Sequence, residues 1–182
     1  MRFVLVDRII ELNSGQSLVA IKNLSLAEEY LADHFPGFPV MPGVLMLEAL
    51  TQAGAWLIRD MEDFAHSVVL LKKARMVKYG SFVEPGRQLQ LKVTLTSNDG
   101  RESSLKGEGT IDGQVMVRGQ ITLMRFNLRD RDPALHATDA QIVAGLRELF
   151  ATLRKGSVGA RAILREPGTG DADVALVEQS GG

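Results

Sequence analysis

The sequence predicts an α+β fold in which an antiparallel sheet wraps around one long central helix. Three observations support this prediction: two strand-like runs open the chain, one long apolar helix follows, and four further strand-like runs come after it. One helix and six strands bury their apolar faces most simply when the sheet covers the helix. The 182 residues suffice for one domain with a proper core, but not for two large domains.

The first half of the chain supplies two strands, a short helix and the long helix. These elements are expected at residues 3–12, 18–24, 26–32 and about 42–61. The turn-forming run Asn13-Ser14-Gly15 separates the two strands. Ser25 and Glu28 have the spacing of a capping box, and Pro42 stands where a first-turn proline belongs. Because the long helix is apolar on every face near its start, we expect it to be buried.

The second half of the chain supplies the remaining strands and a C-terminal extension. Strands are expected at residues 68–77, 88–97, 103–111 and 115–126, arranged as a meander. Asn98-Asp99-Gly100 and Asp112-Gly113 are strong hairpin signals. The chain therefore divides into a main domain over 1–127, a linker with an amphipathic helix over 128–155, and a flexible, glycine-rich tail over 156–182.

The composition excludes several classes of protein. The net charge of -1 gives no overall attraction to nucleic acid or to an anionic membrane. The chain has no cysteine, and its three histidines are far apart in the sequence, so no metal site is expected. The first residues reach Asp7 and Arg8 too soon for a signal peptide, and no run is long enough for a membrane span. These features predict a cytoplasmic protein.

His34 and Glu48 are the candidate catalytic residues. Between them lie three prolines and two glycines, and the apolar stretch 44–58 contains Glu48 as its one charged side chain. Burying an ionised carboxylate without a partner is costly, so we expect Glu48 to be paired or to hold a proton. An imidazole in a stiff loop suits a general base, and a buried carboxyl suits a general acid. Gln52, one helical turn after Glu48, is placed to hydrogen-bond it.

The loop and the long helix resemble those of the hotdog-fold 3-hydroxyacyl-acyl carrier protein dehydratases of the FabA and FabZ types. The likeness rests on three runs: His34-Phe35-Pro36-Gly37, Pro39-Val40-Met41-Pro42-Gly43 and Leu47-Glu48-Ala49-Leu50-Thr51-Gln52-Ala53. Glutamate at position 48 is similar to the FabZ type, whereas the second run is closer to the FabA type. A weaker likeness joins Lys73-Ala74-Arg75 to Glu84-Pro85-Gly86, although the intervening segment is longer than in most FabZ-type enzymes.

The resemblance implies dehydration of (3R)-3-hydroxyacyl-acyl carrier protein to the trans-2-enoyl thioester in fatty acid or related lipid biosynthesis. His34 would remove the C2 proton, with its other nitrogen held by the Val40 carbonyl, while the N–H groups of Gly43 and Val44 stabilise the thioester oxyanion. Glu48 would protonate the leaving hydroxyl. The substrate would arrive on the phosphopantetheine of acyl carrier protein, and no metal or other cofactor is implied. The family also implies a homodimer with shared active sites, with a trimer of dimers as the larger assembly.

Several alternatives remain open at the level of the sequence. A hotdog acyl thioesterase or a non-catalytic subunit that binds the acyl carrier would have the same fold. A cluster of basic residues either contacts the carrier protein or keeps a strand edge soluble; its members are Lys72, Lys73, Arg75, Lys78 and Arg87. Phe38, Tyr79 and Phe82 either line an acyl tunnel or pack at an interface.

Overall fold

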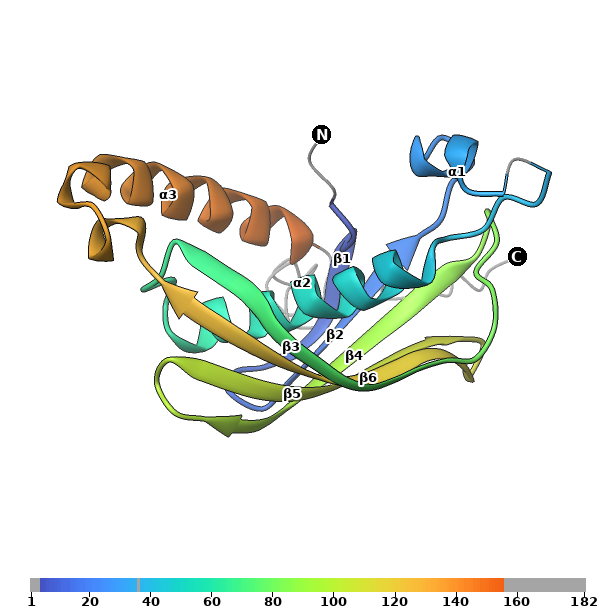
Figure 1. Cartoon of the computed structure of the whole chain (residues 1–182), viewed down its shortest axis with the longest axis horizontal. Helices are drawn as coiled ribbons and strands as arrows, with labels where there is room; N and C mark the ends of the chain where they lie inside the picture. The colour runs from blue at the N-terminus through green and yellow to red at the C-terminus, as the bar shows by residue number, and fades with distance from the viewer. Residues whose placement is uncertain (1–3, 36, 156–182) are drawn as a thin grey trace, which may run out of the picture.

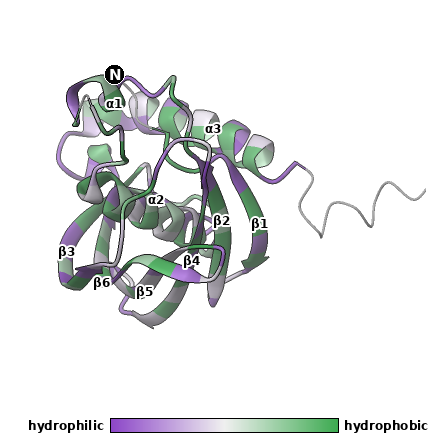
Figure 2. Ribbon diagram, turned by 90° about the vertical axis from the view of Figure 1, so that its right-hand side faces the viewer, coloured by the Kyte–Doolittle hydropathy of each residue, from purple (hydrophilic) through white to green (hydrophobic). Residues whose placement is uncertain are grey.

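The computed structural model describes residues 4–35 and 37–155, which form a six-stranded antiparallel sheet curled around a central helix (Figures 1 and 2). The strands are β1 (Arg8–Asn13), β2 (Ser17–Asn23), β3 (Val68–Tyr79), β4 (Gln88–Asn98), β5 (Glu102–Ile111) and β6 (Gln114–Phe126). The helices are α1 (Tyr30–Asp33), α2 (Gly43–Met61) and α3 (His136–Leu153), with 3₁₀ turns at Leu128–Asp130 and Pro133–Leu135. The predicted α+β fold with one central helix is therefore confirmed.

The strand order corrects one part of the prediction. The sheet runs β1-β2-β4-β5-β6-β3, so β4, β5 and β6 form a meander but β3 does not precede them in space. Instead, β3 pairs with β6 and forms one edge of the sheet, while β4 pairs with β2. Hairpin signals reveal neighbours that are consecutive in the chain, whereas the β3–β6 pairing closes a long loop that carries no local signal.

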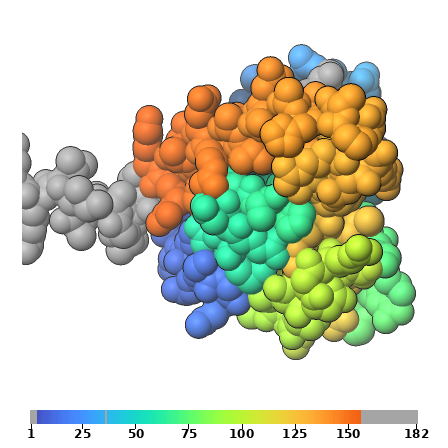
Figure 3. Space-filling view, turned by 90° about the vertical axis from the view of Figure 1, so that its left-hand side faces the viewer, coloured from blue at the N-terminus to red at the C-terminus, as the bar shows by residue number. Residues whose placement is uncertain are grey.

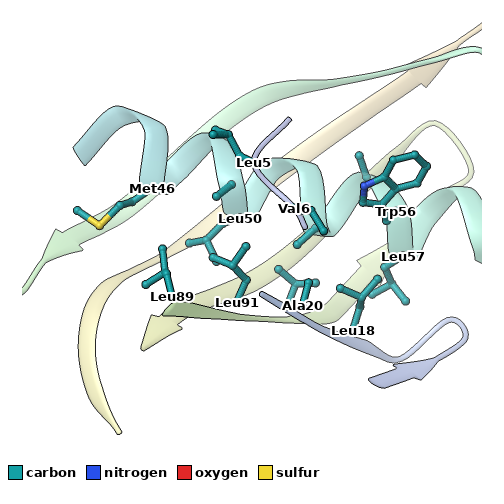
Figure 4. Close-up of a cluster of buried hydrophobic side chains, with 14 of the residues drawn as sticks. Leu5, Val6, Leu18, Ala20, Met46, Leu50, Trp56, Leu57, Leu89 and Leu91 are labelled. Carbon is teal, nitrogen blue, oxygen red and sulfur yellow. The ribbon is translucent and has the colours of Figure 1, made fainter. Parts of the chain in front are cut away.

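The core lies between α2 and the inner face of the sheet. Apolar side chains from α2, from the strands and from the segment before β1 meet there (Figure 4). Two glycines allow a close approach. A Cβ atom on Gly107 of β5 would lie 3.1 Å from Cδ1 of Leu50, and one on Gly54 of α2 would lie 3.1 Å from Cδ1 of Leu123. The helix can therefore lie nearly against the sheet, as dense interior packing requires.

The beginning of the chain differs from the prediction in two places. Strand β1 starts at Arg8, and the preceding Leu5 and Val6 are buried without being part of a strand. The short helix is the single turn α1, and the expected capping box does not form, although the Ser25 hydroxyl accepts from the Ala27 N–H at 3.1 Å. The carboxylate of Glu28 instead pairs with the buried ammonium of Lys22 at 2.5 Å. Compensating a buried charge takes precedence over capping a short helix.

The start of α2 is also more exposed than predicted. Pro42 is the residue before the helix, one position earlier than expected, and Val44 is 69% exposed. From Ala49 to Ile58 the helix is almost entirely buried, apart from the partly buried Gln52. Among the described residues, none of the helices is long and apolar enough to cross a membrane.

Helix α3 packs on the C-terminal half of α2, as Figures 1 and 3 show. The ring of Phe150 stacks on Trp56 with centroids 5.7 Å apart, and it meets Phe64 edge-on at 5.3 Å. At the other end of α3, the buried carboxylate of Asp139 accepts hydrogen bonds from the Ser67 hydroxyl and from the N–H groups of residues 128 and 129. The predicted tail over 156–182 lies outside the described residues.

We expect Phe150→Ala to detach α3 from α2. Removing a buried aromatic side chain should lower the free energy of unfolding by about 3 kcal/mol. Trp56 is the one tryptophan of the chain, so its fluorescence reports the contact directly. The variant should show emission at longer wavelength together with a lower urea midpoint, whereas Leu26→Ala, which truncates an exposed leucine, should show neither change. Unchanged Trp56 emission in the Phe150 variant would refute the docking.

A second prediction concerns acid pH. Burial opposes ionisation of Asp139, but the hydrogen bonds from Ser67, Arg129 and Leu128 outweigh it and lower the pKa of this carboxyl below its ordinary value. Its stabilising contribution is therefore complete above the unfolded-state pKa of about 3.9 and is lost as the pH falls through the folded-state pKa. The difference in urea midpoint between wild type and Asp139→Asn should be widest near neutral pH and should shrink below about pH 4. A constant difference would show that the ionised carboxylate is not responsible.

Candidate active site

His34 lies in the turn that ends α1. Its backbone N–H donates to the Tyr30 carbonyl at 3.2 Å, and its ring packs on Phe35 with centroids 4.3 Å apart. Phe35 has a φ of 53°, a conformation that is strained for a bulky residue and that concentrates at functional sites. Among the described residues, the imidazole makes no hydrogen bond with the Val40 carbonyl or with any other group. The half-buried ring is therefore available to a ligand.

The N-terminus of α2 presents unpaired backbone donors. The Pro42 carbonyl accepts from the N–H groups of Leu45 and Met46 at 2.9 and 3.2 Å, so the first intrahelical bonds begin there. The N–H groups of Gly43 and Val44 precede that turn and have no acceptor within the described part of the chain. Free amides and the helix dipole together favour an anion at this position.

One pocket joins His34 to this helix N-terminus. It has a volume of about 340 Å³ and is lined by His34, Met41, Gly43, Met46, Tyr79, Gly80, Ser81 and Phe82. The ring of Tyr79 covers Gly43 so closely that a Cβ atom there would lie 3.1 Å from Cε1 of the tyrosine. Phe38 packs edge-on against Phe82, with centroids 5.6 Å apart. The pocket thus combines an imidazole, an anion site and an apolar wall.

Glu48 is not part of this pocket. It lies five residues after Gly43 on α2, which turns its side chain about 140° around the helix axis from Gly43. The Gln52 amide donates to Oε1 of Glu48 at 3.0 Å, as the helical spacing predicts. The Gln52 carbonyl oxygen in turn accepts from the Leu5 N–H at 2.9 Å. Within one chain, the structure brings His34 and Gly43 together but leaves Glu48 on a different side of the helix.

The basic residues named from the sequence fall into two places. Lys72, Lys73 and Arg75 line one hollow on the outer side of the sheet, and Lys78 lines the adjoining hollow. Arg87 lies away from them, beside the β5–β6 turn, where it pairs with Asp112 at 2.8 Å. In the part of the chain that the structure describes, no group of three His, Asp or Glu side chains is arranged to hold a metal ion.

Met41, Met46 and Ser81 line the pocket but were not identified from the sequence. Met46 lies three residues after Gly43, on the same face of the helix, so helical periodicity alone could have suggested it. Met41 and Ser81 come from loops, where the sequence carries no such signal.

The sequence of the chain is similar to those of known proteins. A sequence profile of the FabA-like domain matches residues 1–121. The 3-hydroxyacyl-[acyl-carrier-protein] dehydratase FabZ of Oceanobacillus iheyensis is 38% identical over 120 residues, which are 66% of this chain and 86% of that protein. FabZ of Oenococcus oeni is 42% identical over 111 residues, covering 61% and 80% of the two chains.

The solved structures support the fold. The dehydratase heterocomplex ApeI:P from Xenorhabdus doucetiae contains a chain that superposes with a TM-score of 0.60 at 21% identity. The match covers 73% of this chain and 90% of that one. At this level of identity the similarity establishes a shared hotdog architecture.

We expect Gln52→Leu to destabilise the protein. The change removes the acceptor of the buried Leu5 N–H as well as the donor to Glu48, and an unsatisfied buried group costs about 1–3 kcal/mol. The urea midpoint should fall accordingly, while Gln141→Leu, at an exposed position of α3, serves as the matched control. Equal midpoints for the two variants would mean that Gln52 does not tie the chain's first segment to α2.

Proposed function

The chain belongs to the FabA-like family, and we propose that it dehydrates (3R)-3-hydroxyacyl-acyl carrier protein to the trans-2-enoyl thioester in fatty acid or related lipid biosynthesis. The observation that carries this proposal is that His34 and Gly43, at the start of α2, line the same pocket. The chemistry needs no metal or redox cofactor, because the chain's own base, acid and oxyanion donors suffice. The acyl group would arrive on a phosphopantetheine arm.

The reaction is a β-elimination in which each residue has one task. Neutral His34 removes a proton from C2, and the negative charge moves to the thioester oxygen. The N–H groups of Gly43 and Val44 stabilise this charge where it develops. The C3–O bond then breaks as Glu48 donates a proton to the leaving hydroxyl, which gives water and a C2–C3 double bond. Proton transfer from His34 to Glu48 through solvent restores the starting state.

The acid has to come from a second copy of the chain. Glu48 does not line the pocket of its own His34, so one chain holds the base and the oxyanion donors without the acid. We therefore propose a homodimer in which Glu48 of each subunit completes the pocket of the other. A symmetric dimer provides two such sites.

The edge strand β3 is the surface through which we propose that the dimer forms. One side of β3 pairs with β6, and its other side has no partner strand among the described residues. Its exposed apolar residues are Leu70, Leu71, Met76 and Tyr79. Unpaired strand edges with exposed apolar side chains are templates for pairing with another chain. Pairing of β3 with its symmetry mate would also bring the exposed Val44 and Phe82 toward the interface.

Two other functions are alternatives to dehydration. A hotdog thioesterase would hydrolyse the same thioester, but it requires an activated water and gives no role to the His34 imidazole opposite the helix N-terminus. A non-catalytic carrier-binding subunit would give no role to an imidazole and a helix N-terminus that line the same pocket. Both alternatives are tested by the same assay.

The test is hydration of an enoyl thioester, the reverse reaction, followed by loss of enoyl absorbance. We expect His34→Ala and Glu48→Gln each to lower the rate by about 100- to 10,000-fold, because each removes one proton-transfer group. His136→Ala and Glu84→Gln, at exposed positions outside the pocket, should retain wild-type rates. Release of free thiol by the wild type would favour the thioesterase, and the absence of both reactions with carrier-linked substrates would favour the non-catalytic subunit.

A further inference from the structure

A buried lysine lies in a row of side chains that otherwise face the core. Lys22, near the end of β2, is 4% exposed, and it continues the alternation of Leu18 and Ala20, whose side chains point toward α2 (Figure 4). An ammonium group in such a position is costly unless it is paired. Its Nζ lies 2.5 Å from Oε1 of Glu28 and 3.7 Å from Oδ1 of Asp7. Lys22 therefore joins β2 to the segment before β1 and to the segment before α1.

Stability alone does not account for this cluster. Replacing a buried ion pair by apolar side chains of similar volume is often neutral or stabilising. Fixing the start of β1 needs Asp7 alone, because its other oxygen accepts from the Asn23 N–H at 2.5 Å and its own N–H donates to the Ile21 carbonyl at 2.8 Å. The contact between Lys22 and Glu28 is left without a role in the sheet. Where a sequence departs from the simplest packing, a functional site is the expected reason.

The segment that carries His34 has few backbone attachments to the sheet. Figures 1 and 2 show α1 standing apart from the sheet. Between residues 25 and 40, the described backbone groups form backbone hydrogen bonds only within the segment, and the next bond, from the Met41 N–H to the Val83 carbonyl at 2.8 Å, is the first to leave it. One turn of helix is not stable by itself, and Leu31 is the one buried residue of α1. The position of this turn therefore depends on side-chain contacts.

Backbone hydrogen bonds lead from Glu28 to His34. The Leu31 N–H donates to the Glu28 carbonyl at 3.0 Å, and the His34 N–H donates to the Tyr30 carbonyl at 3.2 Å. Burial of the Tyr30 hydroxyl raises its pKa, and the nearby carboxylates of Glu28 and Asp7 raise it further. The His34 imidazole makes no hydrogen bond with a described residue. Its place in the pocket therefore follows mainly from the backbone that carries it.

We propose that Lys22 is a positioning residue for His34, and that its ion pair with Glu28 fixes the turn that carries the imidazole into the pocket. This inference rests on the proposed function, since it gives the ion pair a purpose in catalysis. A buried charge suits the task, because the ammonium is satisfied only where the carboxylates reach it. A displacement of about 1 Å can lower the rate of a catalysed step by about 100-fold. Holding α1 in one place therefore matters directly for proton transfer from C2.

The test compares variants of two neighbouring glutamates. Glu28→Ala removes the partner of Lys22, whereas Glu29→Ala removes an exposed carboxylate from the next position, where it makes no cap hydrogen bond. Glu28→Gln keeps an oxygen that can accept from the ammonium. Hydration of an enoyl thioester gives kcat and KM, and the NMR signals of the imidazole rings report the surroundings of each histidine without substrate. The chain has three histidines, so His66 and His136 are internal controls in the same spectrum.

We expect Glu28→Ala to lower kcat by about 10- to 100-fold while KM changes by less than about threefold, because the base is displaced and the other contacts of the substrate remain. The imidazole signals of His34, identified by their loss in His34→Ala, should shift or broaden, and those of the other two histidines should not. Glu29→Ala should match the wild type in both measurements, and Glu28→Gln should recover most of the lost rate. In a His34→Ala background, Glu28→Ala should cause no further loss, because it acts through that residue.

Other results would overturn the assignment. These are unmoved His34 signals in Glu28→Ala, an equal change of all three histidine signals, or the same fractional loss of rate with and without the imidazole. If Glu28→Ala does not fold, Glu28→Asp, whose carboxylate stops one methylene short of Lys22, takes its place under the same expectations. If the wild type hydrates no enoyl thioester, the proposed function fails, but the imidazole signals still decide whether Glu28 fixes His34.

Discussion

The geometry of one helix determines how this site can be built. Helix α2 offers its free N–H groups at Gly43 to the pocket of His34, and it also carries Glu48. Five residues on an α-helix correspond to about 140° of rotation and about 7.5 Å of rise, and Glu48 does not line the pocket of Gly43. In the proposed dimer, Glu48 serves the pocket of the other subunit, and the Gln52 amide holds its carboxylate in place. Under this proposal, association of two chains is a chemical requirement of the site.

Strand β3 connects the features that surround this helix. Its end supplies Tyr79 to the pocket, and its edge, which has no partner strand among the described residues, is the proposed dimer contact. Lys73, Arg75 and Lys78 lie on its outer side. Alternation of side chains along a strand allows one segment to serve two surfaces. At the other side of the molecule, α3 packs on Trp56 in the C-terminal half of α2, away from the pocket at the start of that helix.

Much of the fold and part of the site could be predicted from the sequence. The long helix, the hairpins around Gly100 and Gly113, and the pairing of Glu48 with Gln52 all follow from local periodicity and turn chemistry. The pairing of β3 with β6 depends on contacts between distant segments, which leave no local pattern. The ion pair of Glu28 with Lys22 depends on how β2 and the segment before α1 pack together. For the same reason, the sequence could not show that Arg87 pairs with Asp112, away from the other basic residues.

The central claim is that His34 and Glu48 of different subunits act together, and subunit mixing tests it most directly. His34→Ala and Glu48→Gln chains, carrying different affinity tags, are co-expressed and the mixed dimers are isolated. If the site is shared, each mixed dimer contains one intact site and one doubly altered site, and it should recover about half of the wild-type rate per dimer. Mixed dimers that form, as native mass spectrometry would show, and yet remain as inactive as either parent would contradict the account.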